Sequence, residues 1–91
     1  MALFDLLGRT WSLGALWQLC EGGPATFRDL QSRCEGVSPT VLNARLKELR
    51  WANLVERTEA GYAATDLGKE FHQMMRPIAF WSHKWASHIE Q

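Results

Sequence analysis

Apolar residues recur at intervals of three and four through much of the chain, which is the spacing of amphipathic helices. The first such stretch runs from about Thr10 to Glu21, and its predicted inner face comprises Leu13, Leu16, Trp17 and Cys20. Gly22-Gly23-Pro24 ends this helix, because glycine suits the end of a helix and proline cannot continue one. Before it, residues 3–7 are expected to form a short N-terminal turn that packs on a partner.

Two capping signals predict two more helices in succession. Thr26 occupies an N-cap position, and Asp29 adds negative charge to the first turn that follows. This short helix is expected to end at Gly36 and to bury Phe27, Leu30 and Cys34. Ser38-Pro39 then supplies a hydroxyl cap followed by a proline at the first helical position, which predicts the start of the next helix.

The helix that begins after Ser38 continues to about Trp51 and has two distinct faces. At about 100° per residue, its predicted inner face comprises Val41, Leu42, Leu46 and Leu49. The opposite, outward face comprises Thr40, Asn43, Ala44 and Lys47. Arg45 is expected on the flank of the apolar stripe rather than on the outward face.

Beyond this helix the pattern predicts a small β-hairpin and then a long helix. Residues 55–58 and 62–64 are expected to pair around Glu59-Ala60-Gly61, where the glycine can take a positive φ angle. Thr65-Asp66 caps a last helix that extends to about Ile89 and carries an apolar seam of Leu67, Phe71, Met74, Ile78, Trp81 and Trp85. Pro77 is expected to kink this helix near Gln73.

The order of these elements predicts the fold. Two short helices, a longer helix and a tight hairpin, with a Gly36-Val37-Ser38-Pro39 turn before the longer helix, are typical of a winged helix-turn-helix. We therefore expect an α+β, mostly α, winged helix-turn-helix with a two-stranded β-wing and a long C-terminal dimerisation helix. Ninety-one residues support a single domain, residues 1–91. Its predicted parts are N-terminal helices (1–25), helix-turn-helix (26–52), wing (54–65) and C-terminal helix (66–90).

The charge of the chain supports nucleic-acid binding only weakly. The formal net charge is zero, whereas DNA-binding domains usually carry a basic surface. Six basic residues nevertheless outnumber four acidic ones between residues 26 and 57, namely Arg28, Arg33, Arg45, Lys47, Arg50 and Arg57 against Asp29, Glu35, Glu48 and Glu56. The five Trp, four Phe and one Tyr are a large aromatic content for this length, and we expect part of it at a subunit interface.

Other classes of function have no supporting motif. The sequence has no Gly-rich phosphate loop, nucleophile elbow or acid–base pair placed by spacing, so we do not expect an enzyme. Cys20 and Cys34 make neither a disulfide framework nor a zinc site. The histidines lack a ligand-rich partner motif, and His83 and His88 are five residues apart, so neither a metal nor a cofactor is expected. With no signal peptide and no apolar stretch of about 18 residues, we expect a cytoplasmic protein with no membrane partner.

Taken together, the motifs resemble those of the HxlR-type winged-helix transcriptional regulators, which are related to the MarR group. The resemblance spans about residues 8–85 and rests on the order of Gly8-Arg9-Thr10-Trp11, Phe27-Arg28-Asp29-Leu30, Gly36-Val37-Ser38-Pro39, residues 42–49, Leu54-Val55-Glu56-Arg57, residues 62–65, Leu67-Gly68, Pro77 and Trp85. It implies a transcriptional regulator that acts as a homodimer, formed by the N- and C-terminal helices, with one recognition helix per subunit in successive major grooves. The expected dimer interface comprises Leu3, Phe4, Leu7, Ile78, Trp81 and Trp85.

The candidate DNA-contacting residues lie mainly on the helix at 38–50. Its candidates for major-groove contact are Ser38, Thr40, Asn43, Ala44 and Lys47, and Pro39 at the first helical position is a further DNA-binding candidate. Asparagine can pair bidentately with adenine, and threonine or alanine can meet a thymine methyl group. Arg28, Arg45 and Arg57 are candidates for phosphate contact, with an internal salt bridge for Arg45 and an ion pair for Arg57 equally open. The partner would be double-stranded DNA, a near-palindromic operator with half-sites about one helical turn apart.

Two other hypotheses remain open. The resembling family usually has basic residues where this chain has Thr10, Thr26 and Thr40, and the wing tip here is the acidic Glu59-Ala60-Gly61. These departures favour a winged-helix protein-interaction module with little DNA affinity. The other hypothesis is a redox-sensing regulator, for which Cys34, beside Arg33, is a better candidate than Cys20. The position of Trp51 stays open between the base of the hairpin and an interface.

Overall fold

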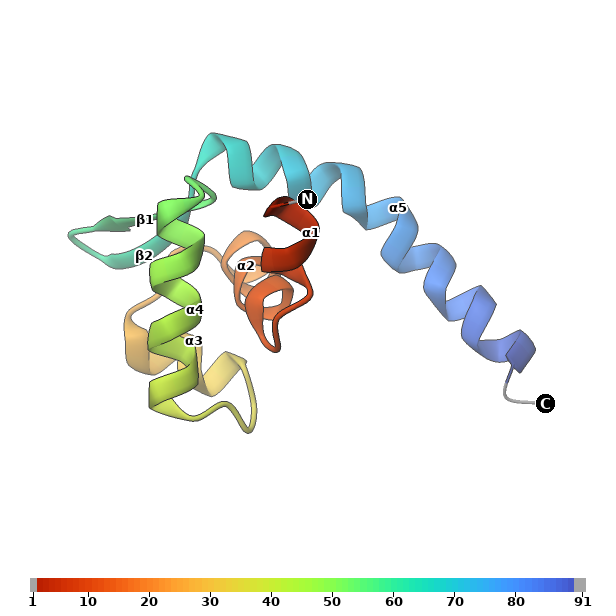
Figure 1. Cartoon of the computed structure of the whole chain (residues 1–91), viewed down its shortest axis with the longest axis horizontal. Coiled ribbons are helices and arrows are strands. Elements are labelled where there is room, and N and C mark those ends of the chain that lie inside the picture. Colours follow the sequence, from red (N-terminus) through yellow and green to blue (C-terminus); the bar gives the residue numbers. More distant parts are fainter. Residues whose placement is uncertain (1, 90–91) are drawn as a thin grey trace.

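The computed structural model describes residues 2–89 and has the architecture that the sequence predicts. Four helices precede an antiparallel hairpin, and a long helix follows it (Figure 1): α1 (Ala2–Leu7), α2 (Ser12–Gly22), α3 (Phe27–Arg33), α4 (Pro39–Trp51), β1 (Val55–Thr58), β2 (Gly61–Ala64) and α5 (Asp66–Ile89). The mostly helical fold with a two-stranded wing is thus confirmed. Residue 90, at the end of the predicted C-terminal helix, lies outside the described residues.

Helix α2 is the centre of the domain, because it contacts α1, α3, α4, α5 and β2. The prediction of its inner face was partly wrong, since the buried residues are Ser12, Ala15, Leu16 and Leu19. Trp17 and Cys20 are only half-buried because they turn toward α5. There the ring centroids of Trp17 and His72 lie 4.5 Å apart, and the thiol of Cys20 lies 3.9 Å from the carbonyl oxygen of Gly68. The buried stripe has the predicted spacing but begins one residue earlier, at Ser12 instead of Leu13, so the side of α2 that faces the core is rotated by one position.

The two predicted N-caps are both present. The backbone N–H of Asp29 donates to Thr26 Oγ1, and that of Val41 donates to Ser38 Oγ. Each bond satisfies one of the unpaired N–H groups at the start of a helix, α3 and α4 respectively. Helix α3 ends at Arg33, before the predicted Gly36. Leu30 and Cys34 are buried as predicted, whereas Phe27 is half-buried.

Helix α4 ends in a hydrogen-bond pattern that the sequence analysis did not identify. Asn53 takes a left-handed conformation with φ of 61°. Its N–H donates to the carbonyl oxygen of Arg50, and the N–H of Leu54 donates to that of Leu49. This pair of bonds is a Schellman motif, with asparagine in the position that glycine usually takes. It reverses the chain sharply, so that β1 starts directly beside the end of α4.

The hairpin differs in register from the prediction. Thr58 pairs with Gly61, so the turn contains two residues, Glu59 and Ala60, and the glycine belongs to β2. Ala25 pairs with Tyr62 through two backbone hydrogen bonds of 2.7 and 2.9 Å, which adds a short third segment to the sheet. At Gly61, where φ is 124°, a Cβ atom would lie only 2.3 Å from the carbonyl oxygen of Ala25. Glycine is therefore needed there both for the positive φ angle, as predicted, and for the close approach of a neighbouring strand.

Helix α5 packs on the body with its first half and leaves it with its second. Figure 1 shows a change of direction within the helix, consistent with the expected effect of Pro77. Gly68 and His72 face the body and are buried, and His72 Nε2 lies 2.6 Å from Glu21 Oε2. Along the second half, Ile78, Trp81 and Trp85 are each about half exposed. This half extends away from the body and leaves the apolar seam uncovered by its own chain.

Candidate nucleic-acid interface

The outward face of α4 is open to solvent, as predicted. Thr40, Asn43 and Lys47 are exposed, and Ala44 is half-buried between them. Leu42, Leu46 and Leu49 point the other way and are fully buried in the core. Ser38 and Pro39 are exposed at the N-terminal end of the same helix. The core therefore fixes α4 by one side and leaves the polar side free for contact with another molecule.

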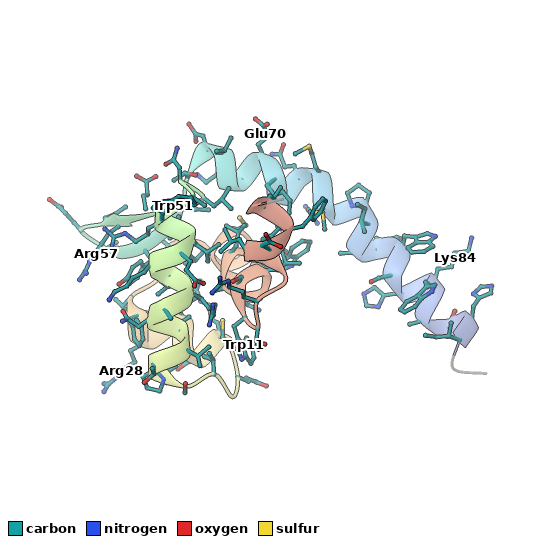
Figure 2. The ribbon with its side chains drawn as sticks, viewed as in Figure 1. Trp11, Arg28, Trp51, Arg57, Glu70 and Lys84 are labelled. Atoms are coloured by element: carbon teal, nitrogen blue, oxygen red, sulfur yellow. The ribbon has the colours of Figure 1, made fainter. Side chains whose placement is uncertain are left out.

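Two of the three predicted phosphate-contacting arginines are accessible beside this face. Arg28 is exposed in the first turn of α3, and Arg57 is exposed on the wing. Figure 2 shows both on the side of the molecule opposite to the second half of α5. The guanidinium of Arg57 lies 5.5 Å from the ring centroid of Tyr62, its cross-strand neighbour, where a cation–π contact steadies it. Arg50, which the sequence analysis did not single out, is exposed in the last turn of α4.

The third of these arginines, Arg45, is turned inward. Its Nη1 atom lies 2.6 Å from Glu48 Oε1, and the side chain is only 18% exposed. The other oxygen of Glu48 lies 2.9 Å from Nη1 of Arg9. The carboxylate of Glu48 thus pairs both with Arg9, in the turn after α1, and with Arg45, in the middle of α4. Of the two alternatives that the sequence left open for Arg45, the structure contains the internal salt bridge, which pairs its charge inside the subunit.

Comparison with known proteins identifies the family to which the chain belongs. A model of the HxlR-like helix-turn-helix family matches residues 6–90. The chain is a member of that family. A Methanocaldococcus jannaschii protein, named as an uncharacterized HTH-type transcriptional regulator, is 28% identical over 89 residues, which are 93% of this chain and 83% of that protein. The HxlR-like family comprises DNA-binding transcriptional regulators and not enzymes, as the sequence analysis predicts.

Solved structures of HxlR-like proteins have the same fold. A possible HxlR family transcriptional factor from Thermoplasma volcanium superimposes with a TM-score of 0.82 at 26% identity, covering 93% of this chain and 82% of that one. The quinone-bound YodB from Bacillus subtilis gives a TM-score of 0.78 at 28% identity, covering 90% of this chain and 92% of that one. Since these similarities cover nearly the whole chain, α5 and the wing belong to the shared architecture.

The two cysteines of this HxlR-like chain lie in surroundings that suppress thiol reactivity. Burial raises the pKa of the Cys34 thiol, whose side chain is only 2% exposed, and Arg33 opposes this only in part. Arg33 instead donates to the carbonyl oxygen of Gly23 at 2.7 Å. Burial also raises the pKa of the Cys20 thiol, with Lys69 opposing. The redox hypothesis therefore gains no support at Cys34, because the thiol is enclosed and the Arg33 guanidinium is engaged with the Gly23 carbonyl.

The sequence did not indicate the position or contacts of several residues. Glu48 gave no signal beyond its spacing of three from Arg45, which is compatible with an ion pair within a helix. The Glu21–His72 contact joins residues 51 positions apart, so no local pattern could indicate it. Trp51, which the sequence left unplaced, is 84% exposed at the end of α4.

Within residues 2–89, no helix is long and apolar enough to cross a membrane. The same part of the chain contains no group of three or more His, Cys, Asp or Glu side chains that could hold a metal ion.

Proposed function

We propose that this HxlR-like regulator binds double-stranded DNA as a homodimer, with α4 of each subunit inserted in the major groove. The observation that carries the proposal is the outward face of α4, where Thr40, Asn43 and Lys47 are exposed while the opposite side is fixed by the core. A helix held in this way can present base-contacting side chains in a defined orientation. Asn43 is suited to adenine, and Ala44 and Thr40 to a thymine methyl group.

Phosphate contacts in this proposal come from Arg28 and Arg57, with Ser38 and Pro39 near the backbone at the start of α4. Arg28 lies toward the N-terminal end of α4 and Arg57 toward its C-terminal end, both exposed on the same side of the molecule, so they can reach phosphates that flank the segment of groove that α4 occupies. Arg45 takes a different role, because its ion pair with Glu48 orders α4 internally. With few accessible cations per subunit, two subunits are needed for useful affinity.

The proposed dimer uses the apolar side chains that the single chain leaves exposed. Phe4 is 67% exposed on α1, Leu3 is exposed next to it, and Leu7 is half-buried. On α5, Ile78, Trp81 and Trp85 are spaced by three and four residues, which places them on one side of the half that extends from the body. Covering exposed aromatic rings is favourable, and aromatic residues are enriched in subunit interfaces. A two-fold axis relating two α4 helices then requires a near-palindromic operator with half-sites about one helical turn apart.

A second candidate is a protein-interaction module with little DNA affinity. The specific observation that favours it is charge, since two of the six basic residues between residues 26 and 57 are turned inward, Arg33 and Arg45. Glu59 at the wing tip is exposed and would face a phosphate backbone unfavourably.

A fluorescence-anisotropy titration of the full chain against genomic DNA fragments, repeated over a salt series, separates the two candidates. The DNA-binding proposal predicts saturable binding at about 50 mM salt and an affinity that falls linearly on a log–log plot as salt rises. Absence of binding at this salt concentration, or binding without a salt slope, would reject it in favour of the interaction module.

A further inference from the structure

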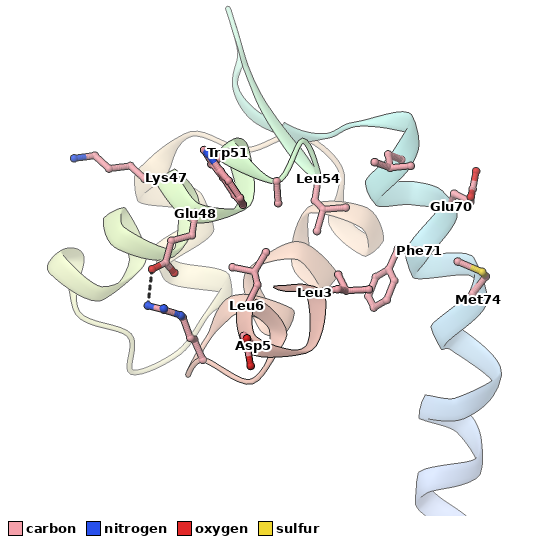
Figure 3. Close-up of a pocket in the computed structure, with 13 residues that line it drawn as sticks. Leu3, Asp5, Leu6, Lys47, Glu48, Trp51, Leu54, Glu70, Phe71 and Met74 are labelled. Carbon is pink, nitrogen blue, oxygen red and sulfur yellow. Dashed lines mark hydrogen bonds and ion pairs between the residues drawn. The ribbon is translucent and has the colours of Figure 1, made fainter. Parts of the chain in front are cut away.

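The two sides of α4 differ in what lies next to them. Glu48 lies on the side that faces α1, where its carboxylate pairs with Arg9 in the turn after α1. Figure 3 shows this ion pair, with the side chain of Lys47 directed away from it. The groove on this side of α4 has mainly apolar walls from α1, α4 and α5, among them Leu6 and Phe71. This side of the helix is therefore turned toward the protein's own chain.

The opposite side of α4 carries a row of exposed polar side chains. Residues two positions apart on an α-helix lie about 200° apart around its axis, so Arg50 points away from the side of Glu48. Asn43, Lys47 and Arg50 are spaced by four and three residues, which aligns them along the helix, and all three are exposed. Figure 1 shows the wing and α1 on different sides of α4. The row thus ends at Arg50, in the last turn of α4 and on the side of the wing.

The guanidinium of Arg50 is free to contact another molecule. Among residues 2–89 it takes part in no hydrogen bond or ion pair. Two other arginines of the helix-turn-helix differ in this respect, since Arg45 pairs with Glu48 and Arg33 donates to the carbonyl oxygen of Gly23. A ligand of Arg50 would therefore have no internal partner to displace.

From these features we infer that Arg50 is a further DNA-contacting residue, which binds a phosphate on the wing side of the groove that α4 occupies. This assignment rests on the proposed DNA-binding function and adds one residue to the same surface. The first residues of a recognition helix contact base edges, whereas its C-terminal end contacts the backbone. A guanidinium suits a phosphate in that position, because it donates two parallel N–H bonds to the phosphate oxygens.

Arg50 also changes the distribution of charge along α4. Of the six basic residues between residues 26 and 57, Arg33 and Arg45 are paired inside the subunit, so four remain accessible, namely Arg28, Lys47, Arg50 and Arg57. Arg28 lies toward the N-terminal end of α4, whereas Arg50 and Arg57 lie toward its C-terminal end. Phosphate contacts at both ends fix the position of α4 along the groove.

Anisotropy titrations of the full chain over a salt series, on a fragment that the unmodified protein binds, test this role with three variants. Arg50→Gln removes one cation from each subunit, so the slope of log affinity against log salt should become shallower by about 2 in the dimer. The affinity at about 100 mM salt should fall on the order of tenfold. Arg50→Lys keeps the charge and should keep the slope. Arg76→Gln makes the same change on α5, two positions before Ile78 and hence on the other side from the seam, and should alter neither quantity.

The salt slope separates contact with DNA from a structural effect. A substitution that only destabilised the fold would lower the melting temperature and leave the slope unchanged, so thermal unfolding of each variant is measured as well. An unchanged slope in Arg50→Gln, or an equal change in Arg76→Gln, would overturn the inference. Loss of preference at one base pair, in place of weaker binding to all sequences, would overturn the assignment to a phosphate.

Failure of this inference can be distinguished from failure of the proposed function. If the unmodified protein binds DNA with a salt slope that Arg50→Gln does not change, only the role of Arg50 is rejected. If the unmodified protein binds no fragment at about 50 mM salt, the DNA-binding proposal is rejected and the role of Arg50 with it.

Discussion

The carboxylate of Glu48 lies 2.6 Å from the guanidinium of Arg45, three residues earlier in α4, and its second oxygen lies 2.9 Å from Arg9. The two side chains in α4 are 18% and 30% exposed, so the pair is partly shielded from water. An ion pair in such a position contributes more than one at the surface, because the loss of one partner leaves the other charge poorly solvated. This relationship gives Arg45 a structural role within α4.

Removal of that carboxylate should therefore destabilise the fold. Glu48→Gln is expected to lower the free energy of unfolding by about 1 kcal/mol or more, because Arg45 and Arg9 lose their common anion. In a domain of this size, a loss of about 1 kcal/mol lowers the melting temperature by roughly 4–8 °C. Thermal unfolding followed by circular dichroism measures this. Glu56→Gln, which changes an exposed carboxylate on β1, is the matched control. An equal fall in melting temperature in both variants would show that the ion pair of Glu48 stabilises the fold no more than an exposed carboxylate does.

Two helical glycines should respond oppositely to alanine. A Cβ atom at Gly68 would lie 2.2 Å from the carbonyl oxygen of Leu54, whereas one at Gly14 would lie 3.5 Å from the Trp11 ring, an ordinary contact. Gly68→Ala is expected to cost about 1–3 kcal/mol through forced displacement of backbone. Gly14→Ala is expected to stabilise by up to about 1 kcal/mol, because alanine favours helix. Urea unfolding measures the stability of both variants, and an undiminished stability of Gly68→Ala would contradict the close packing of α5 on the backbone at Leu54, between α4 and β1.

The proposed dimer makes a prediction about two aromatic positions on opposite sides of α5. Trp85→Ser should shift the sedimentation coefficient toward that of a monomer, since it removes an anchor of the interface. Phe80→Ser changes a side chain that is 83% exposed and lies away from the seam, so it should leave the coefficient unchanged. Analytical ultracentrifugation over a concentration series distinguishes the two. A dimer that survives Trp85→Ser but dissociates in Phe80→Ser would place the interface on the other side of the helix.

Thiol reactivity should follow the raised pKa values of Cys20 and Cys34. Because burial raises both above the ordinary value of 9.0, the folded protein holds less thiolate at neutral pH than an unfolded chain does. Iodoacetamide should alkylate the folded protein more slowly than the urea-unfolded protein at pH 7.5, as counted by mass spectrometry. The thiols favour folding below pH 9.0 and lose that contribution as pH rises above it. Fast labelling of Cys34 in the folded state would contradict its burial.

Local signals in the sequence predicted much of the fold. The N-caps at Thr26 and Ser38 and the apolar side of α4 each depend on neighbours within about four residues, and each is present in the structure. The order of these elements was enough to indicate the winged helix-turn-helix.

The remaining features depend on contacts between distant segments. The hairpin register is fixed by Ala25, which approaches Gly61 from 36 positions away, and the inner face of α2 is set by the elements packed around it. The same holds for the candidate site. The outward face of α4 followed from helical periodicity, but the inward turn of Arg45 depends on Arg9 and Glu48 as well as on spacing. Accessibility of a charged side chain could not be predicted from its position on a helical projection alone.

The most direct measurement is the salt dependence of DNA affinity for Lys47→Ala, on a fragment that the unmodified protein binds. In the proposal Lys47 of each subunit enters the major groove, where its ammonium group is close to both the base edges and the flanking phosphates. Its loss should therefore weaken binding, and the slope of log affinity against log salt should become shallower by up to about 2 in the dimer. Lys69→Ala, which removes an exposed cation from α5, should change neither quantity. An unchanged slope in Lys47→Ala, or the same change in Lys69→Ala, would contradict the claim that the outward face of α4 contacts DNA.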